Sequence, residues 1–355
     1  MFRRVLIVIA IHCAAITLQQ STASAQLGSD AKATDFAIYA GQMATLDTYS
    51  TVLGDVYARE NISVEFGYGI QRPSRNLGNF YAVEDIVTTS SLIDINGDLF
   101  ANRDIEFLDG TDVVGNATYG RSISANASDV VTGVVTQASN TVASIAMPDT
   151  TDFVAGSVDY DLADQQVVNL APGSYRSVDL SGSSLDELHL TSGDYFLRNL
   201  TLGISTDLHL DLTGGQINVY VEDNVNLGTG LQLFVNGTEF VDPGDNPPPS
   251  FVDLASDVTW EVHGDFEIGS GFLNEFFGTV YTPDGNISVD TEAFYGAMIA
   301  GRNVSGDFYL EHFASNRLTA IPEPAAAFVL LLGGVTVICS RRRMSKWRSA
   351  LPVEP

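Results

Sequence analysis

Short runs of alternating apolar and polar residues, separated by Gly, Asn and Asp, fill most of this chain of 355 residues. Leu188-His189-Leu190 and Leu208-His209-Leu210 show the alternation, which directs apolar side chains to one face of a strand and polar ones to the other. The Gly, Asn and Asp residues between the runs are typical of corners that need a positive φ. The pattern therefore predicts an all-β fold built from many short strands.

These strands belong to a repeat led by glycine. Four segments align, each beginning with Gly and reaching Ile eight positions later: Gly54–Ile62, Gly78–Ile86, Gly97–Ile105 and Gly115–Ile123. The pattern returns near the C-terminus in Phe277–Ile287 and Tyr295–Val304. A period of about 18 to 22 residues matches one coil of a parallel β-helix (β-solenoid), in which each coil stacks ~4.8 Å above the last. An antiparallel β-sandwich is the alternative fold, but it does not explain the near-constant spacing.

Two segments interrupt this rhythm. Ser128–Ala146 carries apolar residues at roughly helical spacing before Pro148, which predicts a helix over 128–146 that caps one end of the coil stack. The proline-rich stretch Asp242–Ser250 predicts a stiff surface loop inside the domain, because strands resume on both sides of it.

The N-terminal residues have the pattern of a secretory signal. Arg3 and Arg4 precede the apolar stretch Val5–Leu18, and Ala23 and Ala25 form a small-x-small cleavage site. We therefore expect a signal peptide over 1–25 and a Sec-type export machinery as a partner.

The C-terminal residues have three parts in a fixed order: a Pro-Glu-Pro motif (Pro322, Glu323, Pro324), an apolar run (Ala325–Cys339) and an arginine cluster (Arg341, Arg342, Arg343). The apolar run is shorter than the ~20 residues of a permanent membrane helix. Arginines after such a run stay on the cytoplasmic side and set its orientation. An ordinary C-terminal membrane anchor is the alternative interpretation.

This order closely resembles the PEP-CTERM sorting signal of exported bacterial proteins, here over residues 322–343. The resemblance implies recognition by an exosortase-type membrane protease, with cleavage near Pro322, Glu323 and Pro324. It also implies transient anchoring in the inner membrane, and delivery to the cell surface or extracellular matrix. Residues 344–355 run past the arginines, where such signals usually stop, and are expected to form a cytoplasmic tail.

The domain between these signals, residues 26–321, is strongly acidic. It holds 42 of the 44 acidic residues and 10 of the 17 basic ones, so its formal charge is −32 against −27 for the whole chain. Such a surface repels nucleic acid, which is therefore excluded as a partner. Both cysteines, Cys13 and Cys339, fall in the apolar terminal segments, so the domain has neither a disulfide nor a thiolate metal site.

Two solenoid resemblances add to the fold prediction. The motif at Gly54–Ala58 resembles the Gly-Asp-Val-x-Ala coils of bactofilin-type and related bacterial surface solenoids. The segment Tyr281–Ile287, followed by Tyr295–Ala300, is similar to solenoid domains of exported, pilus-associated proteins.

No familiar catalytic motif is found. The chain has no Gly-x-Ser-x-Gly elbow, His-Glu-x-x-His, phosphate loop or Cys-x-x-Cys, so we predict a protein that is not an enzyme and has no cofactor. In a solenoid, His189 and His209 would stack on one outer face as a metal pair or a pH-sensitive ladder. The simpler interpretation, that both fill solvent-facing positions, is preferred, and no metal ligand is assigned. Asp94-Ile95-Asn96-Gly97-Asp98 hints at calcium but lacks EF-hand spacing, and is interpreted as a turn between coils.

The leading functional prediction is an exported bacterial cell-surface or matrix protein with a structural, adhesive or biofilm-associated role. Its expected partners are the exosortase-like protease, and exopolysaccharide or further copies of the chain. The alternative is a secreted β-helix carbohydrate-active enzyme or polysaccharide-binding protein. Acidic residues are plentiful enough for a paired-carboxylate hydrolase, but too plentiful for any pair to be chosen from the sequence.

Overall fold

The computed structural model describes Leu27 and residues 31–47, 50–65, 74–89, 93–108, 110–124, 126–139, 141–161, 167–182, 185–240, 254–269 and 275–311. These residues belong to one compact unit, Met1–Ala314. The predicted signal peptide, the sorting signal with its tail and the loop at 242–250 lie outside the described residues.

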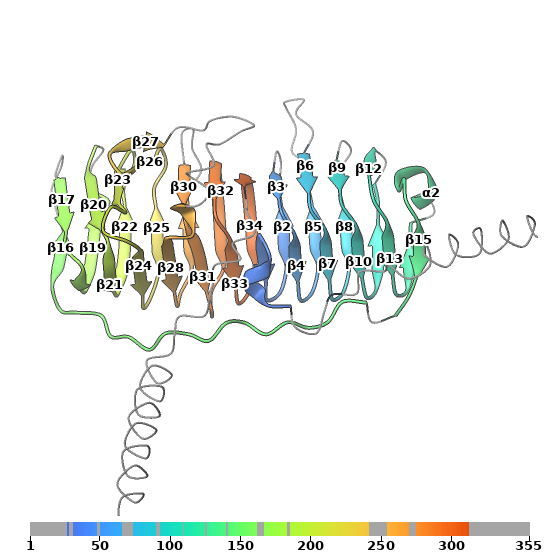
Figure 1. The fold of residues 1–355 in the computed structure, drawn as a ribbon, viewed down its shortest axis with the longest axis horizontal. Coiled ribbons are helices and arrows are strands. Elements are labelled where there is room, and N and C mark those ends of the chain that lie inside the picture. Colours follow the sequence, from blue (N-terminus) through green and yellow to red (C-terminus); the bar gives the residue numbers. More distant parts are fainter. Residues whose placement is uncertain are drawn as a thin grey trace, which may run out of the picture. The chain divides into compact units, whose positions relative to one another are not determined.

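The chain winds into coils, and successive coils contribute strands to three faces (Figure 1). The first face is a twelve-stranded sheet with the order β15 (Val135–Gln137), β13 (Ala117–Tyr119), β10 (Leu99–Ala101), β7 (Phe80–Ala82), β4 (Val56–Ala58), β1 (Ile38–Ala40), β33 (Met298–Ala300), β31 (Thr279–Thr282), β28 (Val258–Val262), β24 (Ile217–Val221), β21 (Gly193–Leu197) and β18 (Gly173–Ser174). A single 3-10 turn, η1 (Ala33–Asp35), precedes β1.

The second face follows the same order of coils, with β14 (Ser122–Ile123), β11 (Asp104–Glu106), β8 (Ile86–Thr88), β5 (Ile62–Val64), β2 (Ala44–Leu46), β34 (Val304–Glu311), β32 (Ile287–Tyr295), β29 (Phe266–Ile268), β25 (Val225–Leu227), β22 (Asn199–Leu202), β19 (Ser177–Leu180) and β16 (Asp159–Asp161). The long strands β32 and β34 continue onto the third face, where they join β12 (Thr111–Val113), β9 (Ile93–Asn96), β6 (Ser74–Leu77), β3 (Thr51–Leu53) and β30 (Glu275–Phe277). A separate five-stranded sheet completes the third face with β17 (Val167–Leu170), β20 (Glu187–Thr191), β23 (Asp207–Asp211), β26 (Gln232–Val235) and β27 (Thr238–Phe240).

Strand pairing among the described residues is parallel, apart from the local hairpin between β26 and β27. The fold is therefore the predicted parallel β-solenoid, and the antiparallel sandwich is wrong. In the N-terminal half, equivalent positions of the glycine-led repeat pair with one another, as Val56↔Phe80, Phe80↔Leu99, Leu99↔Ala117 and Ala117↔Val135 show. The repeat thus sets the register of the coils.

The coils are not stacked in chain order. The chain begins at β1 in the middle of the first sheet, winds out to β15, resumes at β16 at the opposite end and winds back (Figure 1). The last coils then meet the first, because β33 pairs with β1 in the register Ile38↔Met298, Tyr39↔Ile299 and Ala40↔Ala300. Two solenoid halves therefore meet at β1 and β33 through a continuous ladder.

Residues 141–158, called the strap from here on, connect the two ends of the stack in extended conformation (Figure 1). The predicted helix over 128–146 is wrong: only α2 (Ala127–Val130) forms, beside β12, and β15 follows it. The strap starts beside β10, where the N–H of Val142 donates to Asn102, and finishes beside β18, where Val158 bonds to Arg176. These two strands are nine coil steps apart, or about 43 Å at ~4.8 Å each. Eighteen extended residues reach roughly 60 Å, whereas the same residues as a helix would reach only about 27 Å. Only an extended chain closes this distance.

The repeating glycines lie where adjacent coils come too close for a side chain. A Cβ at Gly78, Gly97 or Gly115 would lie 2.0–2.1 Å from the carbonyl oxygen of the matching glycine one coil back. Of the four aligned glycines only Gly54 has a positive φ, 147°. Close approach between coils, rather than the predicted positive φ, is therefore the main reason for this glycine row.

The polar residue after each glycine ties one coil to the next. The backbone N–H of Asn79 donates to Asp55 Oδ1 at 2.7 Å, that of Asp98 to Asn79 Oδ1 at 2.9 Å, and that of Asn116 to Asp98 Oδ1 at 2.7 Å. The interpretation of the Asp94–Asp98 segment as a turn is correct only for Gly97 and Asp98, which form the corner before β10 and place Asp98 in this ladder, because residues 94–96 belong to strand β9.

The inner faces of the three sheets form one apolar core. Leu188 and Leu208 are buried, while His189 and His209 between the buried leucines point outward, as the alternation predicts. Trp260 and Phe276 are fully buried, with ring centroids 5.5 Å apart. Stability in this cysteine-free domain therefore comes from packing and from the ladders between coils.

Candidate functional site

The outer surface of the twelve-stranded sheet carries one continuous row of aligned side chains, many of them aromatic. The row, called the aromatic row, consists of Ser174, Phe196, Tyr220, Glu261, Tyr281, Ile299, Tyr39, Tyr57, Tyr81, Phe100, Thr118 and Thr136. The rings of Tyr39 and Tyr57 stack at 5.0 Å, and those of Phe196 and Tyr220 at 5.2 Å. A surface of this kind has a large apolar area with polar tips, which suits stacking contacts.

The strap covers this row. Tyr39 Oη donates to the carbonyl of Ile145 at 2.7 Å, and Tyr57 Oη donates to the carbonyl of Ala143 at 3.0 Å. Tyr57 Oη also accepts the backbone N–H of Ile145 at 3.0 Å. The row therefore binds an extended peptide through its main chain, and that peptide is part of this chain.

Two carboxylates, Glu261 in the aromatic row and Glu222 just after β24, are also bonded to the strap. Glu261 Oε1 accepts the backbone N–H of Thr151, and Glu222 Oε1 accepts that of Ala155, each at 2.7 Å. The ring of Phe153 lies among Phe196, Tyr220 and His263, with centroid distances of 6.0, 5.6 and 5.0 Å. This surface, which combines aromatic rings with carboxylates, is thus occupied by the protein itself.

A second cluster lies on the five-stranded sheet, where β20 and β23 bring two histidines together. The register pairs His189 with His209 and His209 with Phe234, and it pairs Glu187 with Asp207. The imidazole rings of His189 and His209 stack at 4.0 Å with an interplanar angle of 10°, and Phe234 stacks on His209 at 4.3 Å. Both histidines occupy outward strand positions, as the preferred interpretation expected, and they also form the stack that the sequence offered as the alternative.

Glu187 stands against both histidines. Its Oε2 lies 2.8 Å from His189 Nε2 and 3.9 Å from His209 Nε2, and the His209 nitrogen is buried without a hydrogen-bond partner. Burial lowers the pKa of His209 and the neighbouring His189 lowers it further, while Glu187 partly opposes them; the net shift favours the neutral imidazole. Burial raises the pKa of Asp207, and the charges of Glu187 and Glu239 add to that effect. The ligand atoms of Glu187, His189 and His209 all lie within 4.8 Å of one another, so the cluster has the composition of a metal site.

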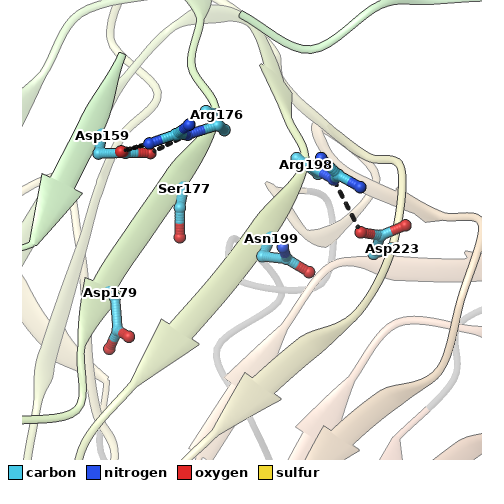
Figure 2. Close-up of a pocket in the computed structure, with 7 residues that line it drawn as sticks. All are labelled: Asp159, Arg176, Ser177, Asp179, Arg198, Asn199 and Asp223. Atoms are coloured by element: carbon cyan, nitrogen blue, oxygen red, sulfur yellow. Dashed lines mark hydrogen bonds and ion pairs between the residues drawn. The ribbon is translucent and has the colours of Figure 1, made fainter. Parts of the chain in front are cut away.

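A polar hollow of about 460 Å³ opens near the β16 end of the second face (Figure 2). Figure 2 shows Arg176 against Asp159 and Arg198 against Asp223, with Nε to carboxylate distances of 2.7 and 3.1 Å. Asp179, Ser177 and Asn199 complete the lining. The hollow offers donors and acceptors to a hydroxyl-rich ligand, and sequence reasoning missed it. The sequence pattern that marks it is an arginine followed by a polar residue at the start of a strand, which occurs in two successive coils as Arg176-Ser177 and Arg198-Asn199.

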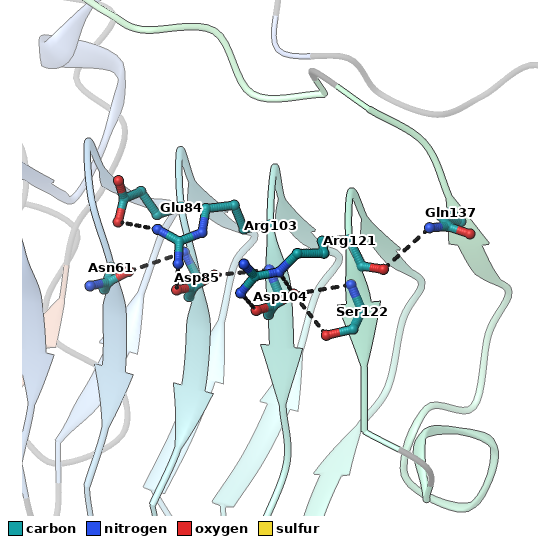
Figure 3. A network of polar contacts seen from close by, with 8 residues as sticks. All are labelled: Asn61, Glu84, Asp85, Arg103, Asp104, Arg121, Ser122 and Gln137. Atoms are coloured by element: carbon teal, nitrogen blue, oxygen red, sulfur yellow. Dashed lines mark hydrogen bonds and ion pairs between the residues drawn. The ribbon is translucent and has the colours of Figure 1, made fainter.

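Many acidic groups are engaged in holding coils together. Figure 3 shows one such ladder, in which the N–H of Asp85 donates to Asn61, that of Asp104 to Asp85 and that of Ser122 to Asp104. Arg121 pairs with Asp104 and, with hydrogen bonds from Ser122, holds the pKa of that carboxyl well below its usual range. These carboxylates have structural partners, which removes them from the set of free catalytic groups.

The residues singled out for export and sorting lie outside the described residues: Ala23, Ala25, Pro322, Glu323, Pro324, Arg341, Arg342 and Arg343. Within the described ranges, no helix has both the length and the apolar character needed to cross a membrane. The sorting prediction therefore stays a prediction.

Comparisons with known proteins give three findings. No curated protein matches this chain. Among solved structures, the chain is similar to the ice-binding protein from an Antarctic bacterium Flavobacteriaceae, at 11% identity over 79% of this chain and 97% of that chain, with a TM-score of 0.28. A family model described as "Domain of unknown function (DUF7305)" matches residues 133–314, which include the strap and the coils from β16 to β34. The chain belongs to this family.

Proposed function

We propose that this chain is a bacterial protein exported to the cell surface or extracellular matrix, where its solenoid has a structural or adhesive role and no catalytic one. The observation that carries this proposal is the strap over the aromatic row. The described surface best suited to binding a flexible ligand by stacking is occupied by residues 141–158. The outer faces that the strap leaves uncovered repeat from coil to coil and carry many carboxylates, which suits repeated contacts with a matrix rather than binding of one substrate.

The route to that location rests on the terminal signals. A Sec-type signal peptide would bring the chain across the inner membrane, and an exosortase-type protease would process it at Pro322, Glu323 and Pro324. The arginine cluster would hold the uncleaved precursor in the membrane with its tail in the cytoplasm. The formal charge of −32 on residues 26–321 keeps the released domain soluble outside the cell.

The sorting step is tested by Glu323→Ala in the bacterium that produces the protein. Fractionation and immunoblotting are expected to show the wild type at the surface or in the medium, and the variant retained uncleaved in the inner membrane. Glu354→Ala, which changes the other C-terminal glutamate beyond the arginines, is the matched control and should be processed normally. Normal release of the Glu323 variant would overturn the sorting proposal.

Polysaccharide binding is the second candidate, and the hollow beside Arg176 and Arg198 favours it. Paired guanidinium and carboxylate groups on an open surface can bond to sugar hydroxyls or to a uronate. Co-sedimentation of the purified full chain with matrix polysaccharide, compared with Arg198→Ala, tests this contact. Chain cleavage of any polysaccharide in the same samples would contradict the non-enzymatic role.

A further inference from the structure

The sheet formed by β17, β20, β23, β26 and β27 repeats one outward pattern on two neighbouring strands. Glu187 and His189 project from β20, and Asp207 and His209 project in the same way from β23. Residues two apart on a strand share a face, and neighbouring strands lie ~4.8 Å apart. The repeat therefore places four groups with lone-pair donors in one patch.

Three of these groups converge on a single point. His189 Nε2 and Glu187 Oε2 are 2.8 Å apart, and His209 Nε2 is 3.9 Å from the same oxygen. The His209 nitrogen is buried and makes no hydrogen bond, although a buried polar atom without a partner is uncommon and costly. A ligand at the point of convergence gives this nitrogen its missing partner.

The chemistry of the donors selects the class of ligand. Two imidazoles and one carboxylate form a ligand set that suits zinc and neighbouring first-row metals. Calcium and magnesium prefer six or more oxygen ligands, which this patch does not offer. Phe234 stacks on one face of His209 and limits the movement of its ring, while Asp207 and Glu239 add negative charge nearby.

We propose that Glu187, His189 and His209 bind one first-row transition-metal ion, with water or a donor from a bound molecule in the remaining position. The rings are nearly parallel with centroids 4.0 Å apart, and Phe234 from the next strand holds the other face of His209, so His189 is the ring that turns about its Cβ–Cγ bond to aim Nε2 at the shared ion. The ligand atoms already lie within 4.8 Å of one another. Two nitrogens bonded to one tetrahedral ion at ~2.0–2.1 Å lie roughly 3.4 Å apart, so a small movement completes the site. The ion would join β20 to β23 and so fasten two successive coils.

The chain supplies its own control for this proposal. Glu261 and His263 repeat the Glu-x-His spacing on β28 and after it, with a distance of 3.0 Å between Oε1 and Nε2. No second histidine lies beside them among the described residues, and Glu261 Oε1 also accepts the N–H of Thr151 from the strap. This pair has the local spacing but only two of the three ligands.

The test uses the full chain in detergent, purified without a histidine tag and stripped of metal with a chelator. Titration with Zn²⁺ by calorimetry should show one ion per chain, and Co²⁺ should give the visible absorption of a site with nitrogen ligands. His189→Ala and His209→Ala should each weaken binding at least about tenfold, since even residues outside the ligand shell cost that much. His263→Ala should bind like the wild type. Zn²⁺ should raise the unfolding temperature only of the wild type and His263→Ala.

Glu187→Gln is a second test that leaves the stack of His209 on Phe234 intact, which removal of His209 does not. This variant keeps the size of the side chain and removes its charge, so it should fold and lose affinity. The proposal is wrong if the wild type shows no saturable binding, or if the folded Glu187, His189 and His209 variants bind Zn²⁺ as tightly as the wild type. These measurements are made on the purified protein, so their outcome is independent of sorting and surface location.

Discussion

Replacing Gly97 with alanine tests why glycine recurs in the coils. A Cβ at Gly97 would lie 2.0 Å from the carbonyl oxygen of Gly78, whereas ordinary contacts begin near 3.4 Å. The obstacle is backbone, which cannot turn away as a side chain would. The two coils must therefore move apart at this point until the new methyl group reaches an ordinary contact distance.

The cost follows from the hydrogen bonds that cross the same gap. Gly78 N to Asn96 O (3.2 Å), Phe80 N to Asp98 O (2.9 Å) and Asp98 N to Asn79 Oδ1 (2.9 Å) join these coils. Such a separation would break all three. At about 1 kcal/mol for each bond, Gly97→Ala is expected to destabilise the domain by roughly 3 kcal/mol.

Gly269→Ala is the matched control, because a Cβ there meets its nearest neighbour, a methyl of Thr229, at 3.4 Å. Both changes restrict the unfolded chain equally, so their difference isolates the crowding between coils. Guanidinium unfolding followed by circular dichroism measures the stability, and hydrogen exchange of β7 and β10 shows whether the loss is local, as expected for a repeat protein. A difference below about 0.5 kcal/mol between the two variants would refute this explanation of the glycine row.

Two further predictions concern the strap and the pH dependence of stability. Tyr57→Phe removes the hydroxyl that bonds the Ala143 carbonyl and the Ile145 N–H. The free energy of unfolding should fall by about 1–3 kcal/mol, and hydrogen exchange of the Ile145 amide should become faster. Unchanged exchange would show that the strap does not depend on this bond. Burial, with the charge of Asp290 next, raises the pKa of Asp307 from 3.8 to about 6, so the folded state binds more protons than the unfolded state between these values. Stability should therefore fall as pH rises through this window, and Asp307→Asn should flatten that slope in thermal melts; an equal slope in both proteins would contradict the assignment.

The histidine cluster on the outer face of the five-stranded sheet shows how much of a site the local sequence pattern can predict. The alternation around Leu188 and Leu208 places His189 and His209 on the same outer face, and their separation along the chain matches one coil. The sequence therefore predicted that both rings face outward, and it offered their stacking as an alternative. It did not predict that Glu187 reaches both rings or that His209 Nε2 is buried, because those facts depend on rotamers and on Phe234 from the next coil.

The strap shows where pattern fails. Val142 and Ile145 have helical spacing and are buried, yet they lie on an extended chain that runs across coils. An extended segment can thus bury two apolar side chains three residues apart, so this spacing alone does not separate the two structures. The distance that the strap has to span excludes a helix, because its eighteen residues would reach only about 27 Å in helical form.

The amino-acid sequence by itself determined the shape of each coil. Three local effects set this shape, each acting within one coil and its neighbour. They are the glycines where coils approach closely, the Asn and Asp residues between coils, and the alternation of apolar and polar residues along each strand. The tertiary structure alone decided the order in which the coils stack, the meeting of β1 with β33 and the closing of the aromatic row by the strap. Because the coils have similar strands at their edges, local hydrogen bonding allows many stacking orders. The order that forms is the one in which the whole chain covers its exposed strand edges and its aromatic face.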